Sequence, residues 1–195
     1  MSVAVEIEKG RGRPRKQETS QRILAAAYEL LTELSYAEVS YEKIAERANV
    51  TRPTIYRRWA AKEILITDAV AGVINDFNRS HPALEDEKEN FRGALYNLVT
   101  ALDEKKLGIV VANIIGAMPH NNVLANFVHK TQQERRQHTL EKIINKAIEK
   151  DFISADRKMG PILDMALGAI YFRLLISGEV VDHSFVDDLV EDLFR

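Results

Sequence analysis

Apolar residues recur along most of the chain at intervals of three and four, and no segment shows the sustained alternation of a β-strand. In the first such segment, from residue 19 or 20 to about residue 34, Ile23, Ala27, Leu30 and Leu31 fall on one helical face. Further helices are expected at about 41–48, 52–59, 61–79, 86–104, 106–117, 122–149, 161–177 and 184–194. The pattern therefore predicts an all-α protein of about nine helices.

Two of the expected helices are short and are separated by a tight turn. Ser40 is a good N-cap for the helix at 41–48, and Asn49, which tolerates the left-handed conformation, follows its end. Pro53 fits only in the first turn of the helix at 52–59, so the cap of that helix is Thr51 or Arg52. This arrangement is typical of a helix-turn-helix, whose second helix lies in the DNA major groove.

The second short helix combines a basic side with two inward-facing apolar residues. Ile55 and Trp59 are four residues apart and are expected to anchor the helix. Arginine can pair with guanine and threonine can meet a base edge, whereas Tyr56 and Lys62 suit phosphates. A solvated basic helix on the surface of a helical bundle is the alternative interpretation.

Several stretches between residues 19 and 66 occur in a characteristic order and spacing. They are Ile23–Ala27, Val39–Ala45, Ala48–Trp59 and Lys62–Leu65. In this order they resemble the N-terminal DNA-binding domain of TetR-family transcriptional regulators. The family usually has glycine in two turns where this chain has Ser35 and Asn49; asparagine visits the left-handed region readily, whereas serine does so less comfortably.

The resemblance implies roles for the matching positions. Thr51, Tyr56 and Lys62 correspond to phosphate contacts, Arg52, Pro53, Thr54 and Arg57 fall where the family reads base edges, and Trp59 packs the recognition helix. With the free N–H groups at the two helix starts included, we expect a DNA interface formed by Ser40, Tyr41, Thr51, Arg52, Pro53, Thr54, Tyr56, Arg57, Arg58 and Lys62.

The N-terminal end carries further positive charge. Residues 9–63 contain 12 Lys/Arg against 7 Asp/Glu, whereas residues 64–195 contain 15 against 20. Within residues 1–17, expected to form a flexible basic arm, Arg11, Arg13 and Arg15 could enter an A·T-rich minor groove. A tail that adds only non-specific affinity is the alternative. We expect the helix-turn-helix domain to span 18–63.

Residues 64–195 are long and apolar enough to form a second, regulatory domain, which in the TetR family binds a small ligand and forms the dimer. The helix at 161–177 is apolar all round, so both of its sides must be covered, and Gly168 would let a second subunit approach closely. The expected homodimer interface, completed by the last helix, comprises Leu163, Leu167, Ile170, Leu174, Phe185, Leu189 and Leu193. The stretch Gly168–Leu193 also resembles the C-terminal end of one common TetR subgroup. A buried central helix in a monomer is the alternative interpretation.

A small apolar or amphipathic effector is the expected ligand. The side chains that could line its pocket are Phe77, Phe91, Tyr96, Asn113, Met118, Phe127 and Tyr171, although ordinary core positions are the alternative interpretation for each. A ligand that favours a different spacing of the two recognition helices would lower DNA affinity by population shift.

The composition and the motifs of the chain exclude several classes of function. The chain has no cysteine, which excludes disulfides, thiol catalysis and cysteine-ligated zinc, and it lacks the common nucleotide-binding, hydrolase and metalloprotease motifs. No enzymatic activity, cofactor, bound metal, membrane span or signal peptide is expected, so the chain is expected in the cytoplasm, associated with the nucleoid. We expect a regulator, a repressor rather than an activator, that binds a palindromic double-stranded operator; a non-specific architectural DNA-binding protein is the alternative.

Overall fold

The computed structural model describes residues 13–78, 85–104, 106–135, 140–154 and 156–194, with the side chains of 13–15, 75–78 and 135 left out. The described residues form helices and no strand, which confirms the all-α prediction. The helices are α1 (Arg13–Glu33), α2 (Tyr41–Arg47), α3 (Arg52–Tyr56), α4 (Lys62–Asn78), α5 (Glu87–Glu104), α6 (Leu107–Ala117), η1 (Met118–His120), α7 (Asn122–Arg135), α8 (Glu141–Glu149), α9 (Met159–Phe172), the π-helical turn η3 (Arg173–Ser177) and α10 (His183–Leu193).

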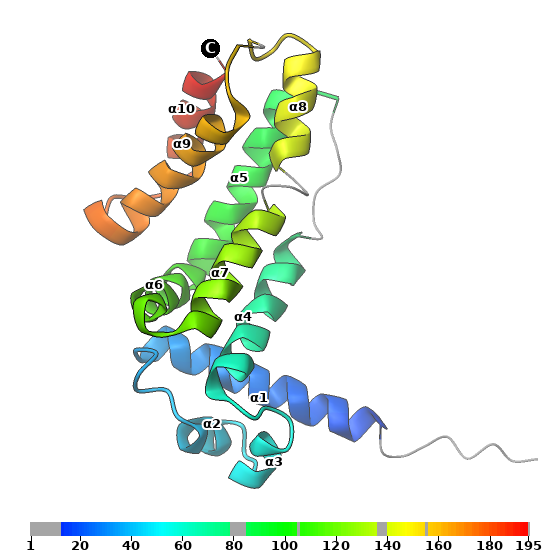
Figure 1. Ribbon diagram of the computed structural model, residues 1–195, viewed down its shortest axis with the longest axis vertical. Coiled ribbons are helices and arrows are strands. Elements are labelled where there is room, and N and C mark those ends of the chain that lie inside the picture. The colour runs from blue at the N-terminus through cyan, green and yellow to red at the C-terminus, as the bar shows by residue number, and fades with distance from the viewer. Residues whose placement is uncertain (1–12, 79–84, 105, 136–139, 155, 195) are drawn as a thin grey trace, which may run out of the picture.

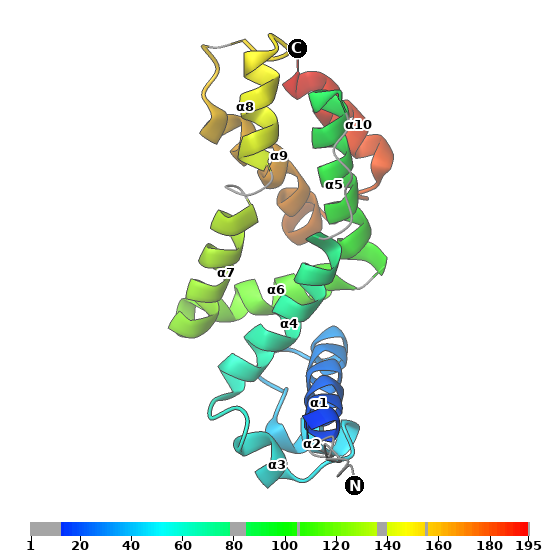
Figure 2. The same ribbon diagram turned by 90° about the vertical axis from the view of Figure 1, so that its right-hand side faces the viewer.

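The helices form an elongated molecule with α1, α2 and α3 at one end and α8, α9 and α10 at the other (Figures 1 and 2). Helix α4 runs from the first group toward the second, and α6 lies across the junction, where it packs against α1. The short helices α2 and α3 therefore lie at one end of the molecule, away from α8, α9 and α10.

The first three helices share a closely packed core. Ile23 and Leu31 of α1, Ile44 of α2 and Ile55 of α3 are fully buried, and Leu65 of α4 joins them. Burying side chains of this size stabilises the unit by about 1.5–3 kcal/mol each. The short helices α2 and α3 are thus held by packing, since helices of this length are marginal on their own.

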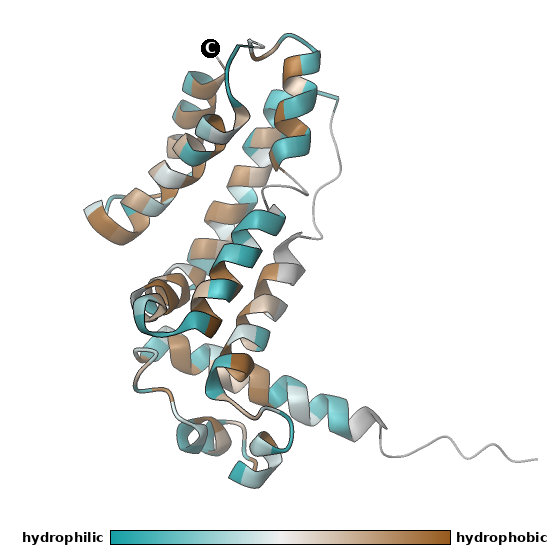
Figure 3. Cartoon of the chain, viewed as in Figure 1, coloured by the Kyte–Doolittle hydropathy of each residue, from teal (hydrophilic) through white to brown (hydrophobic). Residues whose placement is uncertain are grey.

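The larger unit is organised around α5, which contacts α4, α6, α8 and α10. Phe91, Leu95, Leu98 and Leu102 are buried along it. Figure 3 shows that α9 is coloured as hydrophobic along much of its length. Helix α9 is packed against α8 and α10.

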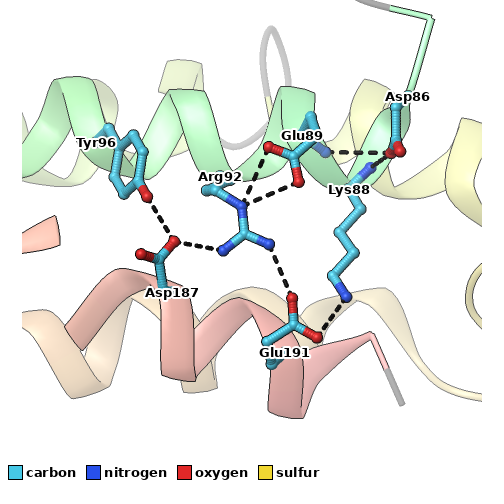
Figure 4. Close-up of polar contacts among 7 residues, drawn as sticks. All are labelled: Asp86, Lys88, Glu89, Arg92, Tyr96, Asp187 and Glu191. Carbon is cyan, nitrogen blue, oxygen red and sulfur yellow. Dashed lines mark hydrogen bonds and ion pairs between the residues drawn. The ribbon is translucent and has the colours of Figure 1, made fainter. Parts of the chain in front are cut away.

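Polar contacts fix α10 to α5 (Figure 4). The Arg92 guanidinium, whose side chain is 13% exposed, donates to Glu89 on its own helix and to Asp187 and Glu191 of α10. The Tyr96 hydroxyl donates to the same Asp187 carboxylate at 2.5 Å, and Lys88 pairs with Glu191. Hydrogen bonds from Tyr96 and Arg92 lower the pKa of Asp187, so its charged form is stabilised.

Three helix boundaries differ from the sequence expectation. Helix α1 begins at Arg13 rather than at residue 19 or 20, so residues 13–17 of the expected arm are helical; Pro14 is tolerated because it lies in the first turn. The expected helix 122–149 is divided into α7 and α8, which pack against different neighbours: α7 on α4 and α6, α8 on α5 and α9. Helix α3 ends at Tyr56, three residues before Trp59.

Candidate DNA-binding interface and regulatory pocket

The turn between α2 and α3 has the conformation that its residues predict. Ser40 is extended (φ −131°, ψ 159°), and its hydroxyl oxygen accepts a hydrogen bond from the Lys43 N–H, so it is the N-cap of α2. Asn49 is left-handed (φ 51°), and the following Val50 N–H donates to the Ala45 carbonyl at 2.9 Å. Both sequence expectations are confirmed, and the turn is closed by local hydrogen bonds.

Helix α3 is anchored from its inner side. Thr51 is its N-cap residue, Pro53 lies in the first turn, and Ile55 is fully buried. Trp59 follows the helix and is 7% exposed, and its indole N–H donates to Asp68 of α4 at 2.8 Å. The inward direction expected for Ile55 and Trp59 is confirmed, and it turns the remaining residues of α3 outward.

The outer side of α3 carries most of the expected DNA contacts. Thr51, Arg52, Pro53, Tyr56 and Arg57 are exposed. Half-buried Thr54 shares a hydrogen bond with Thr51 through the two hydroxyl groups, 3.0 Å apart. Arg52 forms an ion pair with Glu42 of α2, but both side chains are more than half exposed, so this pair is weak.

Tyr41 supports this surface rather than extending it. Its ring lies 4.5 Å from the Tyr56 ring, centroid to centroid, and its hydroxyl donates to the Trp59 carbonyl at 3.1 Å. Burial, with smaller contributions from Tyr56 and Glu63, raises the pKa of Tyr41. Tyr56 itself is 54% exposed, whereas Tyr41 is half-buried.

Two of the expected DNA contacts are bound within the protein. Arg58 is half-buried and donates from Nε to the Ser20 hydroxyl at 3.0 Å and from one terminal nitrogen to the Thr54 carbonyl at 3.1 Å. Lys62 donates to the carbonyls of Tyr36 and Val39, at 3.0 Å each, and burial lowers its pKa. Arg58 therefore ties α3 to α1, and Lys62 closes the turn after α1. Nothing in the local sequence distinguishes these basic residues from Arg57.

The turn after α1 does not require the glycine that the family usually has there. The positive φ angles among the described non-glycine residues belong to Asn49, Lys106 and Asp151, not to Ser35. The N–H and hydroxyl of Ser35 both donate to the Glu38 carboxylate, at 3.0 and 2.7 Å. Serine fits because its side chain contributes to the turn.

The expected arm contacts lie largely outside the described residues. Arg11 is not described, and for Arg13 and Arg15 the backbone belongs to the first turn of α1 while the side chains are not described. Their contact with a minor groove stays a prediction.

A pocket lies in the larger unit between α4, α5, α6, α7 and α9. Its cavity volume is about 40 Å³. Phe127 and Tyr171, both expected at a ligand site, line it, and they are joined there by residues that sequence reasoning missed. The full described lining is Val70, Ile74, Leu98, Leu102, Leu107, Val111, Ile114, Ile115, Phe127, Val128, Thr131, Gln132 and Tyr171.

The other expected ligand residues do not line this pocket where they are described. Phe91 is fully buried and packs on the Phe194 ring, and Tyr96 bonds Asp187. Met118 packs partly buried against the core. The Phe77 side chain lies outside the described residues. Aromatic type predicted these positions poorly, because core residues and pocket walls have the same composition.

Asn113, also expected at the ligand site, instead joins α6 to the helix-turn-helix unit. Its side-chain amide donates to the carbonyls of Leu31 and Leu34, at 2.8 and 3.0 Å, and so satisfies the C-terminal end of α1. The pocket wall and the end of α1 are therefore connected through one side chain on α6.

A second polar contact joins the start of α7 to the same unit. The Asn121 amide nitrogen donates to the Tyr36 hydroxyl and to Glu63, while its amide oxygen accepts from the Val123 and Leu124 N–H groups and caps α7. Tyr36 in turn donates to Glu63 at 2.9 Å. Sequence reasoning missed this cluster, because its members are distant along the chain.

Several of the expected dimer residues are covered within a single chain. Leu163, Leu167, Ile170 and Leu193 are buried by the chain's own core: on an all-apolar helix, periodicity does not say which face that core covers. Leu174 is half-buried, and a methyl group added at Gly108 would lie 2.8 Å from its Cδ1, so Leu174 faces α6. Phe185 and Leu189 of α10 are also half-buried.

The face of α9 and η3 that remains uncovered is largely apolar, although Asp164 is also exposed there. Met165, Phe172 and Ile176 are 48%, 57% and 73% exposed, and Gly168 lies between them with an open surface. By length and composition alone Met159–Ser177 could also cross a membrane, contrary to the expectation that no segment is long enough; the core helix of a soluble protein passes the same test. We call Met165, Gly168, Phe172 and Ile176 the α9 stripe.

Comparisons with known proteins agree with this architecture. Residues 23–69 match the model described as bacterial regulatory proteins, tetR family, and residues 85–193 match the tetracyclin repressor-like, C-terminal domain.

Individual proteins extend the similarity over nearly the whole chain. The uncharacterized HTH-type transcriptional regulator YdeS of Bacillus subtilis is 32% identical over 97% of this chain and 94% of its own length. The DNA-binding transcriptional repressor TetR of Mycobacteroides abscessus is 25% identical over 92% of this chain and 93% of its own length. The transcriptional regulator FadR of Bacillus subtilis, solved with stearoyl-CoA, shares the fold with a TM-score of 0.69 at 19% identity, over 89% of this chain and 97% of its own. Because family models match both parts of the chain, it belongs to the TetR family of DNA-binding transcriptional regulators.

Proposed function

We propose that this regulator is a cytoplasmic repressor that binds a palindromic operator as a homodimer and releases it when a small molecule enters the pocket. Residues 18–63 are the DNA-binding domain and residues 64–195 the regulatory domain. The observation that carries the proposal is the outer side of α3, where base-reading and phosphate-binding side chains are exposed together while Ile55 and Trp59 are buried beneath them.

The side chains on the outer side of α3 differ in how firmly other residues of the protein hold them. Arg57 is exposed and forms no ion pair with any described residue, so it can pair with a guanine edge. Arg52 exchanges Glu42 for DNA, and Thr54 meets a base from the first turn of α3. Tyr56 and Thr51 contact phosphates, which fix the position of α3 in the groove without reading sequence.

Dimerisation through the α9 stripe would present two copies of α3. Exposed apolar side chains on one helix face favour a protein partner, and a two-fold axis makes the same face serve both subunits. Two recognition helices related by this axis match half-sites about one helical turn apart, which requires a palindrome.

Ligand release would use the side chains that connect the pocket to the DNA-binding unit. Helices α6 and α7 form two walls of the pocket, and Asn113 and Asn121 bond these helices to α1, Tyr36 and Glu63. A ligand that moves either wall therefore changes the position of the helix-turn-helix unit. Only a difference in affinity between the two arrangements shifts the population toward release.

The test is a competition measurement with the full chain. DNA fragments from the region upstream of its own gene are titrated by fluorescence anisotropy against random DNA, and a regulator should prefer its palindrome by about 10³ or more. Arg57→Ala should abolish most of this preference. The matched control Lys130→Ala removes an equally exposed positive charge from α7. A preference below about tenfold at every site tested would favour a non-specific architectural protein instead.

A further inference from the structure

We propose that the effector is an electrically neutral molecule: an apolar body with one hydrogen-bonding group, such as a hydroxyl, that meets Gln132 and Tyr171. The inference rests on the proposed function, because it names the chemistry of the ligand that would cause release. It is carried by the lining of the pocket and by one polar contact within it.

Nearly the whole described lining is hydrocarbon. Ten of the thirteen residues are aliphatic or aromatic, contributed by α4, α5, α6 and α7. None of the thirteen carries an acidic or basic side chain. A carboxylate or ammonium placed here would lose its water without gaining a partner of opposite charge among these residues, and that cost is large. An uncharged body gains from burial in the same place.

The remaining three residues, Thr131, Gln132 and Tyr171, form a polar end. The Gln132 side-chain amide donates to the Tyr171 hydroxyl oxygen at 2.7 Å. In this bond the Gln132 amide nitrogen donates and the Tyr171 oxygen accepts, so the bond does not use the Tyr171 hydroxyl hydrogen or the Gln132 amide oxygen. The pair therefore offers one donor and one acceptor side by side. A hydroxyl group on the ligand could satisfy both.

The size of the pocket connects this chemistry to regulation. Because the cavity volume is only about 40 Å³, room for a few water molecules, a ligand with a longer chain must displace a wall. The walls on α6 and α7 are those that Asn113 and Asn121 bond to the DNA-binding unit. A neutral ligand longer than the pocket is therefore the kind that would move that unit.

Three probes with the same eight-carbon chain separate charge from size: 1-octanol, octanoate and octylammonium. Binding to the full chain is measured by isothermal titration calorimetry near neutral pH. We expect 1-octanol to bind at least about 30-fold more tightly than either ion, because an unpaired charge is disfavoured in this lining. An ion that binds within about threefold of 1-octanol, or a failure of all three to bind, would overturn the proposal.

Substitutions in the pocket test whether 1-octanol binds there. Tyr171→Phe and Gln132→Ala should each weaken 1-octanol about three- to tenfold by removing a neutral hydrogen bond, whereas Tyr96→Phe, outside the pocket, should not. Val111→Trp should abolish binding by filling the pocket, and Ala112→Trp adds the same ring at an exposed position of α6 as the control. Unchanged affinity in both polar variants would refute the assigned polar end, whatever the tryptophan variants do.

Parallel DNA titrations separate this inference from the proposed function. If 1-octanol binds as expected but the operator stays bound, the proposed release mechanism is wrong, while the proposed class of ligand is retained. If the protein binds its palindrome specifically but prefers octanoate, the proposed class of ligand is wrong, while the proposed repressor function is retained.

Discussion

Helix α3 and helix α9 both leave one face uncovered, but the two faces differ in chemistry. On and beside α3 the uncovered side chains include Arg52, Tyr56 and Arg57, which can donate hydrogen bonds to phosphates and bases. On α9 they are the apolar residues of the α9 stripe. Each helix is held in place by buried residues on its other side. The exposed face of each helix is therefore where a partner would bind, and the polarity of that face indicates the kind of partner. The contrast makes the two helices separately testable.

The largest effect is expected from a charge in the α9 stripe. Ile176→Glu would place a carboxylate in the proposed dimer contact, where burial without a partner weakens association by at least about 100-fold. Sedimentation velocity should show monomers at concentrations where the wild type is dimeric, with operator binding weakened as a consequence. Ile109→Glu, at an exposed apolar position of α6, is the control. If Ile176→Glu sediments as the wild type does, the α9 stripe is not the dimer contact.

The counterpart on α3 should lose specificity without losing the dimer. Arg57→Ala removes a candidate guanine contact and should weaken operator binding by about 1–3 kcal/mol, roughly 5- to 150-fold, with a smaller effect on random DNA. Anisotropy titrations on both DNAs at one salt concentration measure the ratio. An equal loss on both DNAs would make Arg57 a phosphate contact instead.

Away from both faces, the Arg92 network should affect stability alone. Arg92→Met leaves Asp187 and Glu191 without their shared cation and should lower the free energy of unfolding only modestly, because both carboxylates are about half exposed. Urea denaturation checks this, and Lys130→Met, which breaks only an exposed pair, is the control. A variant as stable as the wild type would show that α10 is held by apolar packing alone.

The same network gives stability a pH dependence. Hydrogen bonds from Tyr96 and Arg92 lower the pKa of Asp187, and those from Lys88 and Arg92 lower that of Glu191. Because the folded pKa values lie below the ordinary 3.8 and 4.5, this contribution is present above those values and is lost as the pH falls through the folded ones. Urea midpoints between neutral pH and about pH 3 should therefore fall less steeply in Arg92→Met than in the wild type. Parallel curves would contradict the assignment.

The smallest effect is expected at the connection between the two units. Asn113→Ala removes two hydrogen bonds to the end of α1 and should cost about 1 kcal/mol of stability while reducing the effect of a ligand on operator affinity. The ratio of operator affinities with and without 1-octanol measures that coupling. Asn126→Ala, at an exposed position of α7, is the control. If this ratio of operator affinities is unchanged in Asn113→Ala, the Asn113 side chain does not contribute to the coupling.

The sequence by itself determined the helix-turn-helix and its anchoring. Ser40, Asn49, Pro53 and the spacing of Ile55 and Trp59 are local signals, because caps, turns and helical faces depend on residues a few positions apart. The same locality explains why Thr51 could be expected at the start of α3.

The tertiary structure alone decided which residues are free. Arg57 and Arg58 are neighbours of the same type, yet Arg58 is bound by Ser20 of α1, and Lys62 by carbonyls of a turn more than 20 residues away. On α9, Leu163 and Ile170 are buried while Phe172 and Ile176 are not, although all four are apolar. Periodicity defines the faces of a helix, but the face that is covered depends on how distant helices pack.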